Sequence, residues 1–292
     1  MRGKRAFSVA KKDIVNHFDS LEKTVFKLTD IEEILRSHSS HWRLINSLTA
    51  KEFIELLIAY TPLKKWEFEE RTETIRRYSW KEDDPYILAL SIHPKSFFSH
   101  YTAMYLHNLT EQIPKSIYVS RELSIKETKS TLLEQKNIDI AFSKSQRMPD
   151  FHNEINKYKI FLLNSQNSLM LGVEEMIINS RKIFVTSLER TLIDITVRPS
   201  YSGGIQEILK AYENAKKSIS VNKLVAILSR MNFIYPYHQS IGFLLQKAGY
   251  RDTQIALLKQ FEIKYDFYLD YEIKNKKFSK EWRLYYPETI KE

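Results

Sequence analysis

Cysteine is absent from the 292-residue sequence, which excludes disulfide bonds, thiolate metal ligands and a cysteine nucleophile. Glycine is scarce, at six residues, and the one adjacent pair, Gly203 and Gly204, lacks the lysine of a phosphate-binding loop. No apolar run approaches the roughly 18 residues of a membrane span, and no apolar segment follows the charged start MRGKRAFSVAKK. We therefore expect a cytoplasmic protein without membrane contact.

Apolar and aromatic side chains are abundant. Hydrophobic residues make up 43% and aromatic residues 13% of the chain, so it can form a folded core, and its length favours two domains. The net charge of +9 favours an anionic partner such as nucleic acid. Because the positive charge is spread along the whole chain, charge alone does not identify a binding region.

The first 80 residues have the pattern of three helices followed by a hairpin. We predict the first helix over residues 11–21, the second after a Thr29 cap and the third after a Thr49 cap. Pro62 ends the helical pattern, and two alternating segments within residues 63–80 predict paired strands. This order is typical of a winged helix-turn-helix, which we assign to residues 1–82.

Polar residues of this region are candidates for DNA contact. The outer face of the third helix carries Glu52 and Glu55, which would repel phosphates, so contact is expected through the helix start, the segment before it and the hairpin. The predicted DNA-binding residues are Arg43, Ser47, Thr49, Lys51, Lys64, Lys65, Arg71, Arg76 and Arg77. The alternative is an adaptor that uses this fold to bind a protein and not DNA.

Residues 83–292 alternate helical segments with apolar, strand-like ones. Strands are predicted at residues 116–120, 159–165 and 182–187. Helices are predicted at residues 188–197, 205–217, 221–231 and 238–248, the last ended by Gly249. The pattern predicts a second, larger mixed α/β domain over residues 83–292, so the whole chain belongs to the α+β class.

The segment VTSLERTLIDITVRP, residues 185–199, contains a compact group of charged residues. Thr186 and Glu189 have the spacing of a capping box, and Arg190 and Asp194 stand four residues apart on a helix. Together with Arg198, the group Glu189, Arg190 and Asp194 forms either a buried or partner-facing network or a solvated helix face.

The segment FFSHYTAMYLHNL, residues 97–109, invites comparison with a catalytic site. Ser99 is a favourable N-cap, and adjacent side chains on a helix diverge by roughly 100°, so His100 is not expected to activate Ser99. Two helical turns place the backbones of His100 and His107 about 10 Å apart, too far to share a zinc ion. We expect a structural helix with no catalytic residue, metal or cofactor.

A nuclease of the restriction type is the main alternative class. It needs a carboxylate close to an acid-x-lysine strand that binds a divalent metal. The chain offers Asp150 and, far downstream, Asp270, Glu272 and Lys274. Because such short matches arise by chance in a sequence rich in glutamate and lysine, we expect no enzymatic activity.

Three segments carry, in this order, a resemblance to a known family: RRYSWKEDDPYILALSIHPKSFFSHYTAMYLHNLTEQIPKSIYVS, VTSLERTLIDITVRPSYSGG and SIGFLLQKAGY. Together they resemble the AbiEi family, the antitoxins of type IV toxin-antitoxin systems and regulators of phage defence. The resemblance spans nearly the whole chain. It implies an N-terminal winged helix that binds operator DNA and represses its own operon, and a C-terminal domain that counteracts a nucleotidyltransferase toxin. The sequence departs from the family in the connection SHSSHWRLINS and in the acidic face of the third helix.

Overall fold

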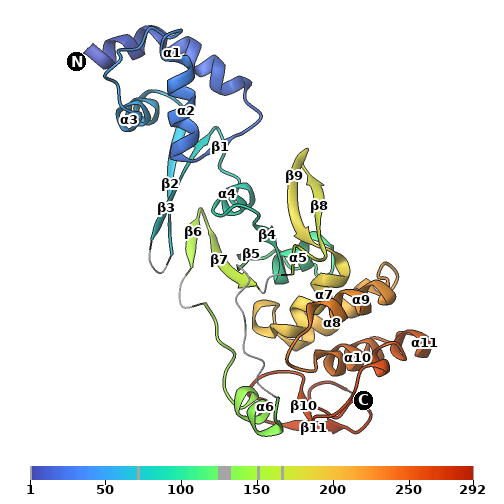
Figure 1. Ribbon diagram of the computed structural model, residues 1–292. Helices are drawn as coiled ribbons and strands as arrows, with labels where there is room; N and C mark the ends of the chain where they lie inside the picture. Colours follow the sequence, from blue (N-terminus) through green and yellow to red (C-terminus); the bar gives the residue numbers. More distant parts are fainter. Residues whose placement is uncertain (1, 71–72, 124–132, 150–151, 166–167, 292) are drawn as a thin grey trace. The chain divides into compact units, whose positions relative to one another are not determined.

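The structure is a computed structural model that describes residues 2–70, 73–123, 133–149, 152–165 and 168–291. It is of the α+β class, as predicted (Figure 1). None of the helices in these ranges is long and apolar enough to cross a membrane. The chain divides into two compact units, Met1–Pro94 with Asn153–Asn156, and Lys95–His152 with Lys157–Glu292.

The first unit contains three helices and a three-stranded antiparallel sheet. Helices α1 (Arg2–Ser20), α2 (Leu28–His38) and α3 (Ala50–Tyr60) lie together, and the hairpin of β2 (Leu63–Glu69) and β3 (Thr74–Trp80) extends away from them (Figure 1). The short strand β1 (Val25–Phe26) pairs with β3, which gives the strand order β1–β3–β2. The core between helices and sheet is aromatic, with Phe18 stacked on Trp80 at 4.7 Å between ring centroids.

Two helix starts differ from the prediction. Helix α1 begins at Arg2 and not at residue 11, because Phe7 and Ala10 continue the buried stripe formed by Ile14 and Phe18. Helix α2 is capped at Lys27 and not at Thr29. The Asp30 carboxylate accepts a hydrogen bond from the Lys27 backbone N–H at 2.6 Å, which sets the helix start two residues earlier.

The first unit also extends beyond the predicted boundary at residue 82. Helix α4 (Pro85–Ser91), capped by Asp84, belongs to it, and so does the distant strand β6 (Asn153–Ile155). The Asn153 side chain explains the second addition: its Oδ1 accepts from the Glu69 backbone N–H at 2.7 Å and its Nδ2 donates to the Glu69 carbonyl at 3.1 Å. Asn153 thereby completes the backbone hydrogen bonds where β2 ends.

The second unit is built on a mixed sheet. Its strands are β4 (Phe97–Phe98), β5 (Ser116–Glu122), β7 (Tyr158–Ser165), β8 (Val173–Ile178) and β9 (Arg181–Thr186), in the order β7–β5–β4–β9–β8. Pairs β5–β7 and β4–β9 are parallel, and pairs β4–β5 and β8–β9 are antiparallel. The three strands predicted from apolar runs are confirmed as β5, β7 and β9.

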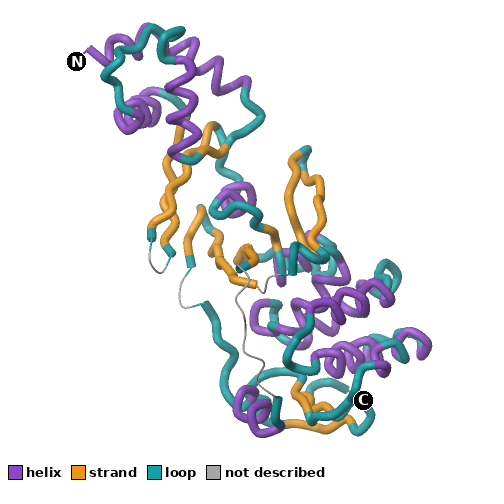
Figure 2. Tube along the Cα trace, in the orientation of Figure 1, coloured by secondary structure: helices purple, strands orange, loops and turns teal. Residues whose placement is uncertain are grey.

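Helices cover this sheet and surround α7 (Leu188–Val197), every residue of which from Glu189 to Thr196 is buried. Helices α8 (Ile205–Ala215), α9 (Val221–Met231) and α10 (Tyr237–Lys247) pack on α7 (Figures 1 and 2). The remaining elements are α5 (His100–Leu106), α6 (Gln135–Phe142), α11 (Asp252–Ile255), two short 3₁₀ turns and a small sheet of β10 (Phe267–Tyr268), β11 (Lys276–Ser279) and β12 (Leu284–Pro287). The helices predicted between residues 188 and 248 are confirmed, with ends within two residues.

Candidate functional site

The start of α3 is the centre of the predicted DNA contact. Thr49 caps the helix in a reciprocal arrangement: its hydroxyl accepts from the Glu52 backbone N–H at 3.3 Å, and the Glu52 carboxylate accepts from the Thr49 backbone N–H at 2.9 Å and from the Thr49 hydroxyl at 2.8 Å. The bond from the Thr49 backbone, followed by the one from its hydroxyl, lowers the pKa of Glu52. The Thr49 hydroxyl is thus committed to the cap, and a carboxylate occupies the helix N-terminus where a phosphate would bind.

Arg43, Ser47 and Lys51 remain exposed beside this cap. Arg43 lies between buried Trp42 and Leu44 and has a left-handed backbone conformation, with φ 53°, so its side chain is directed to solvent. Neither Arg43 nor Lys51 has an ion-pair partner among the described residues. These two side chains are therefore free to bind an anion.

The hairpin cations are exposed but paired. Glu67 lies directly opposite Arg76 across the strands and binds it at 3.0 Å, and it also binds Lys65 at 2.7 Å, while Lys64 lies 3.5 Å from Asp83. The hydrogen bonds from Lys65 and then Arg76 lower the pKa of Glu67. Exposed ion pairs of this kind contribute about 0–1 kcal/mol, so a phosphate could replace the carboxylate.

Arg77 is not an exposed hairpin cation, and the prediction that it contacts DNA is wrong. Its side chain is 8% exposed; Nε donates to the Ser91 carbonyl at 2.6 Å and Nη2 donates to the Ile92 carbonyl. Successive strand residues point to opposite faces, so Arg77 faces α4 while its neighbour Arg76 faces solvent. Arg71, a further predicted contact in the hairpin, lies outside the described residues.

A second group of cations was missed by the sequence analysis. Helix α1 carries the exposed residues Lys4, Arg5, Lys11 and Lys12. No described residue forms an ion pair with any of them. The signal was present in the spacing of Phe7, Ala10 and Ile14, which extends the helix to Arg2. On that helix Arg5 and Lys12 lie opposite the buried stripe, and Lys4 and Lys11 lie beside it.

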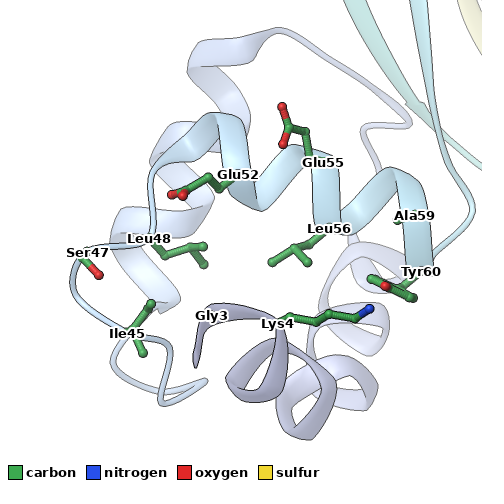
Figure 3. A pocket seen from close by; sticks show the side chains of 10 residues that line it. All are labelled: Gly3, Lys4, Ile45, Ser47, Leu48, Glu52, Glu55, Leu56, Ala59 and Tyr60. Carbon is green, nitrogen blue, oxygen red and sulfur yellow. The ribbon is translucent and has the colours of Figure 1, made fainter. Parts of the chain in front are cut away.

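A shallow groove of about 610 Å³ lies between the start of α1 and the outer face of α3 (Figure 3). Its floor contains Leu48 and Leu56, and Glu52 and Glu55 stand at its side. Lys4 reaches across to Tyr60, with Nζ 5.1 Å from the ring centroid. The lining is formed by Gly3, Lys4, Ile45, Ser47, Leu48, Glu52, Glu55, Leu56, Ala59 and Tyr60.

In the second unit, the predicted charged group on α7 is mostly buried. Arg190 is 2% exposed; its Nε donates to the Asp194 carboxylate at 2.7 Å and its Nη1 donates to the Leu171 carbonyl at 2.8 Å. Burial raises the pKa of Asp194, and the Arg190 charge offsets only part of that rise. This arrangement favours the structural interpretation of Arg190 and Asp194, because neither side chain faces solvent.

The Glu189 side chain does not form the predicted capping box but contacts the start of α9. The N-cap of α7 is Ser187, whose hydroxyl accepts from the Arg190 backbone N–H at 3.3 Å, so the predicted capping box of Thr186 and Glu189 is wrong by one residue. The Glu189 carboxylate instead accepts from the Ser220 backbone N–H at 3.2 Å and pairs with Lys223 at 2.9 Å. Burial alone would raise the pKa of Glu189, but these hydrogen bonds outweigh it and lower that pKa.

The Ser99–His100 pair also departs from the prediction. Ser99 is the N-cap position of α5, but His100 has φ 51°, so the two side chains converge and Ser99 Oγ lies 2.8 Å from His100 Nδ1. Burial, followed by the nearby charges of Arg198 and Arg190, lowers the pKa of His100 to about 3. Ser99 Oγ also bonds Ser120 Oγ at 2.7 Å, and both hydroxyls are buried. The pair therefore joins the β4–α5 junction to β5 in the interior of the unit.

Arg198 is the one member of the predicted α7 group that is exposed, and it ends that helix. The other histidine of the segment, His107, donates from Nε2 to the Thr186 carbonyl at 2.6 Å and so holds α5 to β9.

The residues proposed for a nuclease do not form a site in the described part of the chain. Asp270 accepts from the Tyr271 backbone N–H at 2.8 Å in its own turn, and burial raises its pKa. Glu272 and Lys274 are exposed, and Asp150 lies outside the described residues. Within the described ranges, no three His, Asp or Glu side chains are grouped closely enough to hold a metal ion.

No protein-family model matches the sequence, and no curated protein matches it. The fold is similar to the crystal structure of the Rv2827c protein from Mycobacterium tuberculosis, at 13% sequence identity and a TM-score of 0.61. The superposition covers 97% of this chain and 91% of that chain. At this identity the likeness concerns the fold alone.

Proposed function

We propose that the protein is an antitoxin of the AbiE-like type IV class that binds operator DNA through its first unit and represses its own operon. The observation that carries the proposal is the element order of that unit, helix–strand–helix–helix–strand–strand, with the strand order β1–β3–β2. This is the order of a winged helix-turn-helix, with α3 as the recognition helix and the β2–β3 hairpin as the wing. The protein acts in the cytoplasm, beside its promoter.

The distribution of free cations supports DNA contact at the start of α3. Arg43 and Lys51 are exposed and unpaired among the described residues, and the wing adds Lys64, Lys65 and Arg76 in weak surface pairs. Glu52 and Glu55 keep phosphates away from the remainder of α3. In this arrangement the backbone of DNA is held by the helix start and the wing, whose cations flank the helix.

The second unit is proposed to counteract a nucleotidyltransferase toxin. This part of the proposal rests on the sequence resemblance and on the order of its segments, two of which form α5 with β5 and α7 in the core of that unit. Arg198 is the member of the α7 group that is exposed and so available to a partner or an RNA. Direct contact with the toxin is not required by the proposal.

The repressor half is tested with a reporter gene under the protein's own promoter. We expect the full chain to lower reporter expression, and the double variant Arg43→Ala with Lys51→Ala to lose most of that repression, because it removes two unpaired cations. Lys280→Ala, which removes an exposed cation of the second unit, is the matched control and should repress like the wild type. Equal repression with and without the protein would contradict this half.

The antitoxin half is tested by co-expression with a nucleotidyltransferase encoded beside its gene. We expect the full chain to restore growth, and the Arg43→Ala, Lys51→Ala variant to restore it equally, because the two tasks belong to different units. Failure of the wild-type chain to restore growth would contradict the antitoxin half and leave the repressor half standing.

One observation favours the adaptor as a second candidate: the outer face of α3 is acidic and adjoins the apolar groove. An adaptor would leave the reporter unrepressed while still binding a protein, so the reporter experiment separates the two functions.

A further inference from the structure

The groove between α1 and α3 combines an apolar floor with a carboxylate that has no ion-pair partner among the described residues. Leu48 and Leu56 are only half buried, so part of their apolar surface remains in water (Figure 3). Glu52 is engaged by the Thr49 cap, but Glu55 forms no ion pair with any described residue. A ligand that fits this groove would offer an apolar anchor with a cation next to it.

The outward face of α1 has this chemistry. Val9 is 81% exposed, the highest value among the large apolar side chains described in the first unit, where Leu28, Ile58 and Tyr60 follow. Arg5 precedes Val9 by one helical turn and Lys12 follows it by nearly one, so the three side chains share one face. Neither cation has an ion-pair partner within the described part of the chain.

We propose that the groove binds the outward face of α1 from a second copy of this chain. Val9 of one copy then lies on Leu48 and Leu56 of the other, and Lys12 or Arg5 faces Glu55. An amphipathic helix held in an apolar groove by a flanking charge pair is a common mode of recognition. Because each copy offers both the helix face and the groove, two reciprocal contacts can close a symmetric dimer.

The contact does not depend on the proposed DNA binding. It uses Glu55 and the apolar floor of the groove beside α3, whereas the DNA contact is assigned to Arg43, Lys51 and the hairpin. The test of the dimer contact therefore requires no DNA and no toxin. A negative result for the dimer leaves the proposed DNA binding untouched, and a negative result for DNA binding leaves the dimer untouched.

The absence of native cysteine allows a direct test by disulfide trapping in the full-length protein. Val9→Cys and Ala59→Cys chains are purified separately, one with a mass tag, then mixed under oxidised glutathione. We expect the mixed disulfide to accumulate clearly faster than in the matched pair Asn16→Cys with Ala59→Cys, which moves the thiol toward the other end of α1. Equal accumulation in the two pairs would overturn the proposed contact.

Charge exchange supplies a second, independent measurement by light scattering after gel filtration. We expect the wild type to be dimeric in the micromolar-to-millimolar range, and Glu55→Lys to weaken self-association by about tenfold or more because it opposes Arg5 and Lys12. Glu33→Lys, the same change at an exposed site on α2, is the control and should associate like the wild type. Adding Lys12→Glu to Glu55→Lys should restore the dimer.

Three results would overturn the proposal. A wild type that stays monomeric at every concentration would show that no second copy occupies the groove. A wild type that forms a ladder of larger species would contradict the reciprocal arrangement. A double variant that stays monomeric while Glu55→Lys alone dissociates would exclude α1 as the occupant. Thermal unfolding of each variant confirms that a lost dimer is not a lost fold.

Discussion

Arg76 and Arg77 are neighbours in the sequence but have opposite roles. Arg76 is exposed and pairs with Glu67 across the hairpin, whereas Arg77 is buried and donates to the carbonyls of Ser91 and Ile92. The difference follows from the two-residue period of a strand, which turns one side chain to solvent and the next to α4. A charged residue in a strand is therefore a candidate for binding only if its side chain lies on the solvent-facing side of the sheet.

The first prediction compares these two arginines. Arg77→Ala should lower the free energy of unfolding by about 2–4 kcal/mol, because two buried carbonyls lose their donors. Arg76→Ala should cost less than about 1 kcal/mol, since it breaks an exposed pair. Urea unfolding followed by tryptophan fluorescence measures both. Equal losses for the two variants would contradict the assignment of Arg77 as a structural residue.

A second prediction concerns the two arginines of α7. Arg190→Ala leaves the Asp194 carboxylate buried without its partner and should cost about 3–5 kcal/mol. Arg198→Ala, at an exposed position, should leave the unfolding midpoint nearly unchanged, and its effect on rescue from the toxin then reports a contact role. The unfolding midpoint is measured on each purified variant, and rescue is measured as growth of cells that express the same variant with the toxin. An Arg190→Ala protein of wild-type stability would contradict the buried ion pair.

His100 predicts how stability depends on pH. Its pKa is about 3 in the fold and 6.5 ordinarily, so below pH 6.5 the unfolded chain takes up a proton that the folded chain does not. His100 therefore makes stability fall as the pH falls, by about 1.4 kcal/mol per pH unit between about pH 6 and pH 4. The stability is fully present above pH 6.5.

The variant His100→Asn tests this dependence, because asparagine tolerates the left-handed backbone and can still bond Ser99. Relative to the wild type, its stability should fall less steeply between pH 6 and pH 5. His41→Asn, at an exposed position, is the control and should keep the wild-type dependence. Parallel curves for the wild type and His100→Asn would show that His100 is protonated in the fold.

At the scale of the element, several local signals predicted helix ends correctly, although the caps of α2 and α7 were misplaced by one or two residues, and contacts between distant segments were not predicted. The Thr49 cap of α3 and the end of α10 before Gly249 depend on residues within one helical turn, and the sequence predicts both. The inclusion of Asn153 in the first unit depends on a contact across more than eighty residues, which no local pattern contains.

The same limit applies within the second unit. Gly242 is required because a Cβ at that position would lie 2.2 Å from the Trp282 ring. The residues next to Gly242 in the sequence do not predict that contact. His100 illustrates a different failure, since its left-handed backbone overrides the helical geometry from which the divergence of Ser99 and His100 was predicted.

The cap of α3 gives a prediction at this scale. Thr49→Ala removes the side-chain acceptor for the Glu52 backbone N–H and should lower the free energy of unfolding by about 1 kcal/mol. Ser47→Ala, two residues earlier and exposed, should change it by less than about 0.5 kcal/mol. Thr49→Ser should keep nearly the wild-type stability, because serine retains the hydroxyl that accepts from the Glu52 backbone N–H. Equal effects of Thr49→Ala and Ser47→Ala would contradict the cap.

At the scale of the whole molecule, the two units differ in how the predicted charged groups are placed. In the first unit, cations on α1 and beside the start of α3 have no ion-pair partner among the described residues. In the second unit, Arg190 and Asp194 of α7 pair with each other in the interior, and Glu189 pairs with Lys223. The element order of the first unit matches that of a DNA-binding module, and this order, together with the cations beside the start of α3, carries the proposal. The central claim is therefore that the first unit recognises the protein's own promoter.

The most direct test is the affinity of the full-length protein for that promoter, measured by fluorescence anisotropy over a range of salt concentrations, against a shuffled duplex of equal composition. We predict tighter binding to the promoter, with an affinity that falls linearly with the logarithm of salt. The Arg43→Ala, Lys51→Ala variant should flatten that slope by about two, close to one for each lost phosphate contact. Equal affinity for promoter and shuffled DNA, or no binding at low salt, would contradict the account.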